Sequence, residues 1–301
     1  MFNLYLQYEY WFAASQLFLA MLGMGATMTL RDFQDVVREP KSFGIGTAMQ
    51  LLLVPLLTFG FIYALGITGA LAVGLAICAA IPGGTVSNIF TLLARGNVAL
   101  SIAITAVTTV ACLVTTPIVL SLLIAQYMPP QFQMPIGRIA FEIGICLLAP
   151  LVLGMVIYHF NRDRAGVFSK WCIRSSLFII LIIVVGSLGS GRLNLQAFGL
   201  DNILVMLAFI ALLTLVGWFS PRILGLSRRD TTAIGMEITV RSTNLGLLIK
   251  AVLFPAVVGV ADPWGDTILF AVLLYGGLML LISTGLIGWQ RYSLKNDTAL
   301  L

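Results

Sequence analysis

Residues 237–244 read Glu-Ile-Thr-Val-Arg-Ser-Thr-Asn and place an acid and a base four residues apart, inside a stretch that is otherwise apolar enough to span a bilayer. Ionisable side chains at membrane depth are costly and usually functional. A second polar interruption, Pro-Gly-Gly-Thr-Val-Ser-Asn at residues 82–88, lies far upstream between apolar flanks. Two interrupted spans, one in each half of the chain, are typical of secondary transporters built from repeats.

The composition indicates a polytopic membrane protein. Hydrophobic residues make up 59% of the chain and charged residues 10%, and the mean hydropathy is +1.03. Soluble domains carry about 25% charged residues. A helical span needs roughly 20 apolar residues. We therefore expect an all-α protein with nine transmembrane helices, near residues 10–30, 40–66, 69–95, 98–126, 138–160, 168–190, 200–220, 230–254 and 266–290.

The basic residues predict the orientation, because cytoplasmic loops retain an excess of Lys and Arg. Of the 17 Lys and Arg residues, thirteen fall on one side of the predicted spans and Arg241 falls within a span. Only Arg138, Arg192 and Lys250 fall towards the other side. We therefore expect a cytoplasmic-membrane protein with its N-terminus outside and its C-terminus inside. The net charge of +5 is then explained by the inner face and indicates no nucleic-acid partner.

The first interruption is expected to unwind its helix. Pro82 lacks a backbone donor, and Gly83 and Gly84 tolerate non-helical dihedral angles. Carbonyl oxygens freed in this way cannot be satisfied by lipid, so they must face protein, water or a ligand.

Side-chain oxygens gather around this interruption. They belong to Thr85, Ser87 and Asn88, to Ser101 and Thr105 on one face of the next helix, and to Gln50 on the preceding helix. Glu237 can add a full negative charge to these neutral oxygens. Hard oxygen ligands with one carboxylate favour a small hard cation.

Each of these residues also has a structural alternative, which the sequence leaves open. Ser101 and Thr105 can bond to carbonyls of their own helix, and Gln50 can join two helices. The Pro82-Gly83-Gly84 turn can be a packing kink, and Glu237 can be a structural partner of Arg241. Their occurrence together favours ion binding.

The chain divides into two halves at residues 126–131, Gln-Tyr-Met-Pro-Pro-Gln. Each half ends with a long span, an interrupted span and a further apolar helix. The two interrupted spans run in opposite directions across the membrane in the expected topology. The halves are therefore interpreted as inverted repeats.

The motifs closely resemble those of the bile acid:sodium symporter family. The resemblance is carried by residues 82–88, which continue through Leu-Ala-Arg-Gly-Asn-Val-Ala-Leu-Ser at 93–101, and by Gly-Met-Gly-Ala-Thr-Met-Thr-Leu-Arg-Asp-Phe at 23–33. It implies a core domain, in which two discontinuous helices cross, and a flatter panel domain. The implied divisions are panel helix 1 at 1–30, the first core half at 31–130, panel helices 5 and 6 at 131–192 and the second core half at 193–301.

The resemblance also implies two sodium sites and a substrate site. The first sodium site is implied at Ser87, Asn88, Ser101, Thr105 and Glu237. The second is implied at Gln50, Glu237 and the carbonyls of Ile238 and Val240, but Arg241 stands where a glutamine is expected. Arginine has five donors and no acceptor, so this departure puts the second site in doubt. An anionic substrate is expected at the helix N-termini around Gly84, Thr85, Ser242 and Asn244.

The resulting prediction is a secondary transporter that moves an organic anion with Na⁺ across the bilayer by alternating access, and not an enzyme. The substrate class is a bile acid-like anion or a small carboxylate. One alternative is a relative coupled to protons or to a single cation, or one that exports its substrate, with Arg241 in place of the second sodium. Another alternative is a membrane receptor that retains the fold without turnover.

Overall fold

All regular elements in the part of the chain that the structure describes are helical. The computed structural model describes residues 2–29, 40–128 and 132–299. Its elements are α1 (Phe2–Gln7), α2 (Glu9–Gly25), α4 (Pro40–Ala48), η2 (Met49–Leu53), α5 (Val54–Ala64), α6 (Gly69–Ala80), α7 (Thr85–Leu93), α8 (Val98–Ile124), η3 (Ala125–Tyr127), α9 (Ile136–Ile143), η4 (Gly144–Leu148), α10 (Ala149–Phe160), α11 (Arg162–Gly189), α12 (Leu195–Phe198), α13 (Leu200–Ile223), α14 (Arg228–Thr239), α15 (Thr243–Leu253) and α16 (Pro263–Ala299).

Six helical segments of the described chain are long and apolar enough to cross a membrane. They are Pro40–Ala64, Val98–Tyr127, Ile136–Phe160, Arg162–Gly189, Leu200–Ile223 and Pro263–Tyr292. Each overlaps one of the predicted spans. The three remaining predicted spans contain α2 and two pairs of shorter helices, so the count of nine crossings stays a prediction.

Both predicted interruptions are breaks between helices, as expected. In the first, α6 ends at Ala80 and α7 begins at Thr85, with Gly84 extended at φ −135° and ψ 175°. In the second, α14 ends at Thr239 and α15 begins at Thr243, with Val240 leaving the helix at φ −98° and ψ 98°. Pro82 accounts for the first break because its ring cannot continue the helix.

The two breaks pair with each other. Gly83 and Arg241 form an isolated antiparallel bridge, and the Ser242 amide donates to the Pro82 carbonyl at 2.9 Å. Backbone groups that lipid cannot satisfy are thereby bonded to each other. The first turns of α7 and α15 consequently start from a common point inside the protein.

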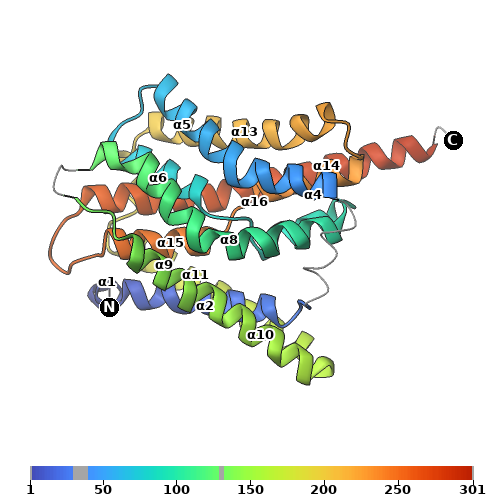
Figure 1. Cartoon of the computed structure of the whole chain (residues 1–301). Helices are drawn as coiled ribbons and strands as arrows, with labels where there is room; N and C mark the ends of the chain where they lie inside the picture. The colour runs from blue at the N-terminus through green and yellow to red at the C-terminus, as the bar shows by residue number, and fades with distance from the viewer. Residues whose placement is uncertain (1, 30–39, 129–131, 300–301) are drawn as a thin grey trace.

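A separate group of helices packs along one side of this centre. α2 makes its most extensive contacts with α11 and α10, and Figure 1 shows the three together at the bottom of the view, with α4, α5 and α13 at the top. The closest approach is at Gly25 and Gly154, where an added Cβ would meet the backbone of the opposite helix. This group matches the helices expected in a panel, and the division into panel and core stays a prediction.

Some sequence-based boundaries fall outside the described residues. The predicted domain limits at 30/31 and at 130/131 lie in residues 30–39 and 129–131. The same holds for part of the 23–33 motif and for part of the segment at 126–131 that divides the two halves. α2 begins and α16 ends at opposite ends of the bundle, which is the arrangement that an odd number of crossings requires (Figure 1).

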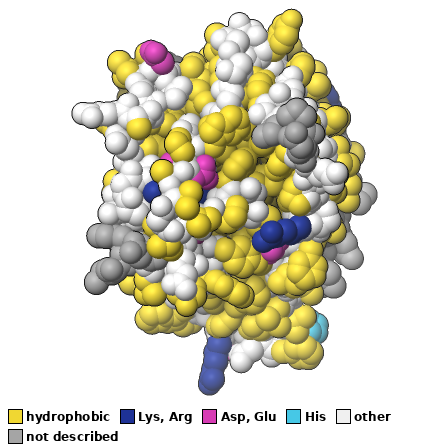
Figure 2. Space-filling model, turned by 90° about the vertical axis from the view of Figure 1, so that its left-hand side faces the viewer, with side chains coloured by type: hydrophobic (Ala, Val, Ile, Leu, Met, Phe, Trp, Pro, Cys, Tyr) yellow, Lys and Arg dark blue, Asp and Glu magenta, His cyan; other side chains and the backbone are white. Residues whose placement is uncertain are grey.

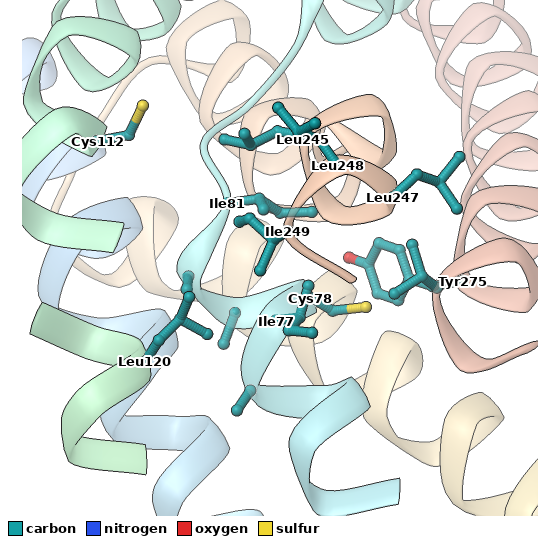
Figure 3. Packing of buried hydrophobic residues seen from close by; sticks show 14 of the residues in the cluster. Ile77, Cys78, Ile81, Cys112, Leu120, Leu245, Leu247, Leu248, Ile249 and Tyr275 are labelled. Atoms are coloured by element: carbon teal, nitrogen blue, oxygen red, sulfur yellow. The ribbon is translucent and has the colours of Figure 1, made fainter. Parts of the chain in front are cut away.

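Buried apolar side chains pack α6, from the first broken span, against α15, from the second. Figure 3 shows Ile77, Cys78 and Ile81 near the end of α6, opposite Leu245 and its neighbours on α15. These side chains are buried and belong to one continuous hydrophobic cluster.

A hydrogen bond adds a further tie to this packing. Tyr275 of α16 lies beside the same cluster and donates its hydroxyl to the Thr239 carbonyl at 2.9 Å. One of the carbonyls at the end of α14 is therefore satisfied by a neighbouring helix.

Candidate cation and substrate site

Three hydroxyl groups from two helices converge on the carboxylate of Glu237. Ser87 Oγ and Ser101 Oγ each lie 2.6 Å from Glu237 Oε1, and Thr105 Oγ1 lies 2.8 Å from it. Asn88 Oδ1 lies 2.7 Å from Ser101 Oγ and 3.2 Å from Thr105 Oγ1. All five residues proposed for the first sodium site are thus brought into one cluster.

Local helix geometry explains this convergence. Ser87 and Asn88 lie in the first turn of α7, directly after the break. Ser101 and Thr105 are four residues apart on α8, so they share one face. Glu237 lies in the last turn of α14 before the second break. Each helix contributes the side chains nearest the crossing of the two breaks.

The cluster has more acceptors than hydrogens. The single hydroxyl hydrogen of Ser87 faces Glu237 Oε1 and the Gly84 carbonyl oxygen, which lie 2.6 and 2.5 Å from its Oγ. The hydroxyl of Thr105 faces Glu237 Oε1 and the Ser101 carbonyl oxygen at 2.8 and 3.0 Å. One hydroxyl can donate only one hydrogen. The Gly84 carbonyl also accepts from the Ser87 amide at 3.0 Å, so the unfilled acceptor capacity lies on Glu237 and on Asn88 Oδ1, where a bound cation would neutralise it.

One polar residue of this cluster was missed by the sequence analysis. Thr91 is fully buried, and its Oγ1 lies 3.2 Å from Ser101 Oγ. It stands four residues after Ser87, so it shares a helix face with a proposed ligand. That spacing was the available signal.

The second carboxylate oxygen faces Gln50 across Gly83. A Cβ added at Gly83 would clash with Glu237 Oε2 and would lie 3.1 Å from Gln50 Nε2. Glu237 Oε2 and both polar atoms of the Gln50 side chain are buried and have no hydrogen-bond partner among the residues that the structure describes. Gln50 lies in η2, a π-helical turn of the kind that is often found at functional sites.

The remaining residues of the second proposed cation region are buried around the second break. Ile238 and Val240 are both 0% exposed and flank the end of α14. The Arg241 side chain is 2% exposed. Its Nη2 donates to the Ala79 carbonyl at 2.8 Å and to the Ile81 carbonyl, while its Nε and Nη1 find no hydrogen-bond partner in the described part of the chain.

The position of Arg241 has an electrostatic reason. The carbonyls that it binds lie at the C-terminal end of α6, which carries a partial negative charge. A small cavity of about 10 Å³ lies beside this guanidinium and beside Gln50. A space of this size holds about one water molecule. The region expected to hold a second cation therefore already contains a fixed positive charge.

A larger cavity of about 650 Å³ lies between the α2 group and the crossing. Gly84, Thr85, Ser242 and Asn244, the four residues proposed for the substrate, all line it. The rest of its wall is mainly apolar and comes largely from α11 and α16. The cavity thus has a polar pole at the start of α7 and α15 and an apolar body.

Two further polar residues near this cavity were not found from the sequence. Ser176 of α11 lines it and donates to the Gln16 carbonyl at 2.7 Å. Gln16 of α2 donates from Nε2 to the Asn244 carbonyl at 2.9 Å, and its buried Oε1 has no partner within residues 2–29, 40–128 and 132–299. The available signal was a pair of polar residues beside apolar sequence in each case, Ser15 with Gln16 on α2 and Ser175 with Ser176 on α11.

Comparison with known proteins agrees with the motifs. The sequence profile of the sodium bile acid symporter family matches residues 14–197. The chain is 30% identical over 236 residues to the uncharacterized sodium-dependent transporter YocS of Bacillus subtilis, covering 78% of this chain and 72% of that protein.

More distant relatives are longer than this chain. The probable sodium/metabolite cotransporter BASS1, chloroplastic, of rice is 28% identical over 231 residues, which cover 77% of this chain and 56% of the relative. Human sodium/bile acid cotransporter 4 is 30% identical over 183 residues, covering 59% and 42% respectively.

Gly83→Ala is expected to disrupt the cluster, because the new methyl group would occupy the space of Glu237 Oε2. We expect the wild-type protein in detergent to have a higher melting temperature in sodium chloride than in choline chloride, and we expect Gly83→Ala to lose this difference. Gly84→Ala is the matched control, since its Cβ would make ordinary contacts of 3.4 Å or more. An equal sodium response in wild type and Gly83→Ala would contradict the geometry described here.

Proposed function

The chain is a multi-pass membrane protein that belongs to the sodium bile acid symporter family, and on this basis we propose that it is a secondary transporter that couples an organic anion to sodium. Relatives in bacteria, plants and mammals carry names that specify sodium-dependent transport. The proposal assigns the same coupling to this protein.

The observation that carries the proposal is the excess of acceptor oxygens around Glu237. Sodium is a hard cation that prefers carboxylate, hydroxyl and amide oxygens. Ser87, Asn88, Ser101, Thr105 and Glu237 supply all three kinds within one cluster. Binding would hold α7, α8 and α14 together, because each helix contributes at least one ligand. Sodium would thereby stabilise the arrangement of the crossing that accepts the substrate.

We further propose that this protein uses one sodium ion per cycle. Two like charges about 4 Å apart repel by about 4 kcal/mol at an effective dielectric constant near 20. Arg241 places such a charge on the carbonyls of Ala79 and Ile81, beside Gln50 and the small cavity. The guanidinium would take the place of the second cation and keep the two breaks together throughout the cycle.

The large cavity supports an organic anion as substrate. Its polar pole is formed by the first turns of α7 and α15, where backbone amides and helix dipoles favour negative charge. Its apolar walls suit a hydrocarbon body. A bile acid-like anion or a smaller carboxylate would lie with its acidic group towards Thr85, Ser242 and Asn244.

Transport would follow from movement between two groups of helices. The cavity lies between the α2, α10 and α11 group and the crossing, so relative movement would open it to alternate sides. In this proposal the former group is the panel and the remaining helices are the core. The proposed setting is the cytoplasmic membrane, with the N-terminus outside.

Reconstitution into proteoliposomes tests the proposal directly. Uptake of radiolabelled bile acids and small carboxylates would be measured with an imposed sodium gradient, with a proton gradient and with neither. We expect uptake only with the sodium gradient. Uptake driven by protons alone would favour the proton-coupled alternative, and saturable binding without uptake would favour a receptor.

Glu237→Gln is expected to abolish sodium-driven uptake, because the neutral amide cannot supply the charge that three hydroxyl groups and the ion require. The protein should remain folded, as judged by size-exclusion chromatography in detergent. Asp163→Asn, which neutralises an exposed acid on α11, is the control and should transport normally. Uptake by Glu237→Gln at the wild-type rate would rule out this role.

Asn88→Ala and Thr105→Ala should each weaken sodium activation. Loss of one buried ligand costs about 1–3 kcal/mol, or about 5- to 150-fold in the half-saturating sodium concentration. Thr108→Val is the control on the same helix, because Thr108 is fully buried but bonds only within α8. Unchanged half-saturation in both ligand variants would count against an ion between α7 and α8.

Arg241→Gln tests the one-ion proposal. Restoring a second cation site should raise the Hill coefficient for sodium, measured from initial rates of uptake. If Arg241 instead binds the substrate's carboxylate, the substrate KM should rise with the sodium dependence unchanged. Arg222→Gln, which removes an exposed arginine from α13, serves as the control. Two sodium ions bound to the unmodified protein would refute the substitution.

A further inference from the structure

Three buried charged residues and the partly exposed Asp266 form a cluster outside the proposed sodium and substrate sites. Glu9 accepts hydrogen bonds from Lys250 Nζ at 2.8 and 3.0 Å, from Arg192 Nη1 at 2.7 Å and from the Ala256 amide at 3.1 Å. Arg192 also pairs through Nε with Asp266. The two acids and two bases balance each other in charge.

The depth of burial separates this cluster from ordinary surface ion pairs. Glu9 is 5% exposed, Arg192 8% and Lys250 0%. Exposed ion pairs contribute little to stability, whereas removing one member of a buried pair leaves an uncompensated charge. In the sequence, Arg192 and Lys250 indicate only two charges towards the outer side of the predicted spans. Their pairing depends on the tertiary structure.

The cluster joins helices that the proposed transport cycle must separate. Glu9 begins α2, whereas Lys250 lies on α15 and Asp266 on α16. Arg192 lies in the connection between α11 and α12. The cluster therefore links the α2 group to the second broken helix at the end of the bundle where α2 begins.

α2 runs from the charged cluster to the large cavity, so the cluster lies at one end of the helix that bounds the cavity. From Glu9 to Gln16 the helix bonds to α15 and to the segment after it. Further along, Ala20, Met21 and Met24 line the large cavity instead. The packed first half of α2 therefore bounds the cavity only on its own side. Leu188 and Leu193, on either side of Arg192, and Phe270, one turn after Asp266, also line the cavity, so the cavity reaches this end of the bundle beside the charged cluster. Figure 2 shows this end of the molecule, where a few charged side chains lie among many hydrophobic ones.

We propose that Glu9, Lys250, Arg192 and Asp266 form a latch that closes the cavity at this end and breaks once in each transport cycle. The inference rests on the alternating movement of the proposed function. In the proposed topology the latch is the external gate.

Ionic contacts suit a gate that must reopen. The mutual attraction of buried charges is largely offset by the loss of their hydration, so a buried ion pair contributes little net stability. When the helices separate, water can solvate all four charged groups, whereas an apolar interface of equal area would expose hydrophobic surface. The hydrogen bonds also fix the register of α2 against α15 in the closed state.

Cysteine accessibility tests the latch without requiring a substrate or sodium. The four native cysteines, Cys78, Cys112, Cys146 and Cys172, are replaced by alanine, and Ala13→Cys is introduced as a reporter. Ala13 is 2% exposed and lies one turn after Glu9 on α2. A membrane-impermeant maleimide is then added to proteoliposomes from the side where α2 begins. Ala72→Cys on α6, at a position that is 0% exposed, reports general unfolding.

With the latch intact, we expect slow labelling of both reporters. Glu9→Gln and the milder Asp266→Asn should accelerate labelling of the Ala13→Cys thiol, by about tenfold for Glu9→Gln, while the Ala72→Cys thiol stays protected. Asp201→Asn, which neutralises an exposed acid at the start of α13, should change neither rate.

Two results would overturn the latch. One is unchanged labelling of the Ala13→Cys thiol in both Glu9→Gln and Asp266→Asn. The other is parallel acceleration at both reporters in both variants, which would make the cluster a structural element and not a gate. Because labelling does not require sodium, failure of the sodium-coupling experiments would leave this test interpretable.

Discussion

The backbone polar groups released by two broken helices are the constraint on which the rest of this structure depends. In a bilayer no water is present to satisfy them, so they must bond within the protein. The bridge between Gly83 and Arg241 and the bond from Ser242 to Pro82 meet part of this need. The Arg241 guanidinium meets another part at the carbonyls of Ala79 and Ile81. The packing of α6 against α15 in Figure 3 surrounds this pairing with apolar side chains.

The proposed sodium site follows from the same constraint. Since both helices restart at the crossing, the first-turn residues Ser87 and Asn88 meet Glu237 at one point. Gly83 permits the carboxylate to approach the backbone closely. Ser101 and Thr105 each have one hydroxyl hydrogen to share between Glu237 Oε1 and Asn88 Oδ1, so acceptor capacity is left over, and a cation is its natural complement. In the region proposed for the second cation, beside the same crossing, the positive charge comes from the Arg241 side chain.

The cavity and the charged cluster connect this static arrangement to transport. The crossing provides the polar pole of the cavity, and the α2 group provides part of its opposite wall. Gln16 and Glu9 hold α2 to the second broken helix at successive depths. A movement of the α2 group would therefore act on the element that also carries Ser242 and Asn244. Substrate binding and closure would be coupled through α15.

Much of the architecture could be predicted from the sequence because it depends on local chemistry and on the bilayer. Apolar length predicts helical spans, Pro82 and its glycines predict a break, and the spacing of Ser101 and Thr105 places both on one helix face. The comparisons confirmed the family that the motifs indicated.

Only the tertiary structure decided which distant groups meet. Glu9 and Lys250 are 241 positions apart, and no local pattern predicts their contact. The same holds for Gln16 with Asn244 and for the choice of Ala79 and Ile81 as partners of Arg241. Such pairings depend on how whole helices pack, because a buried charge takes whichever partner that packing brings within reach.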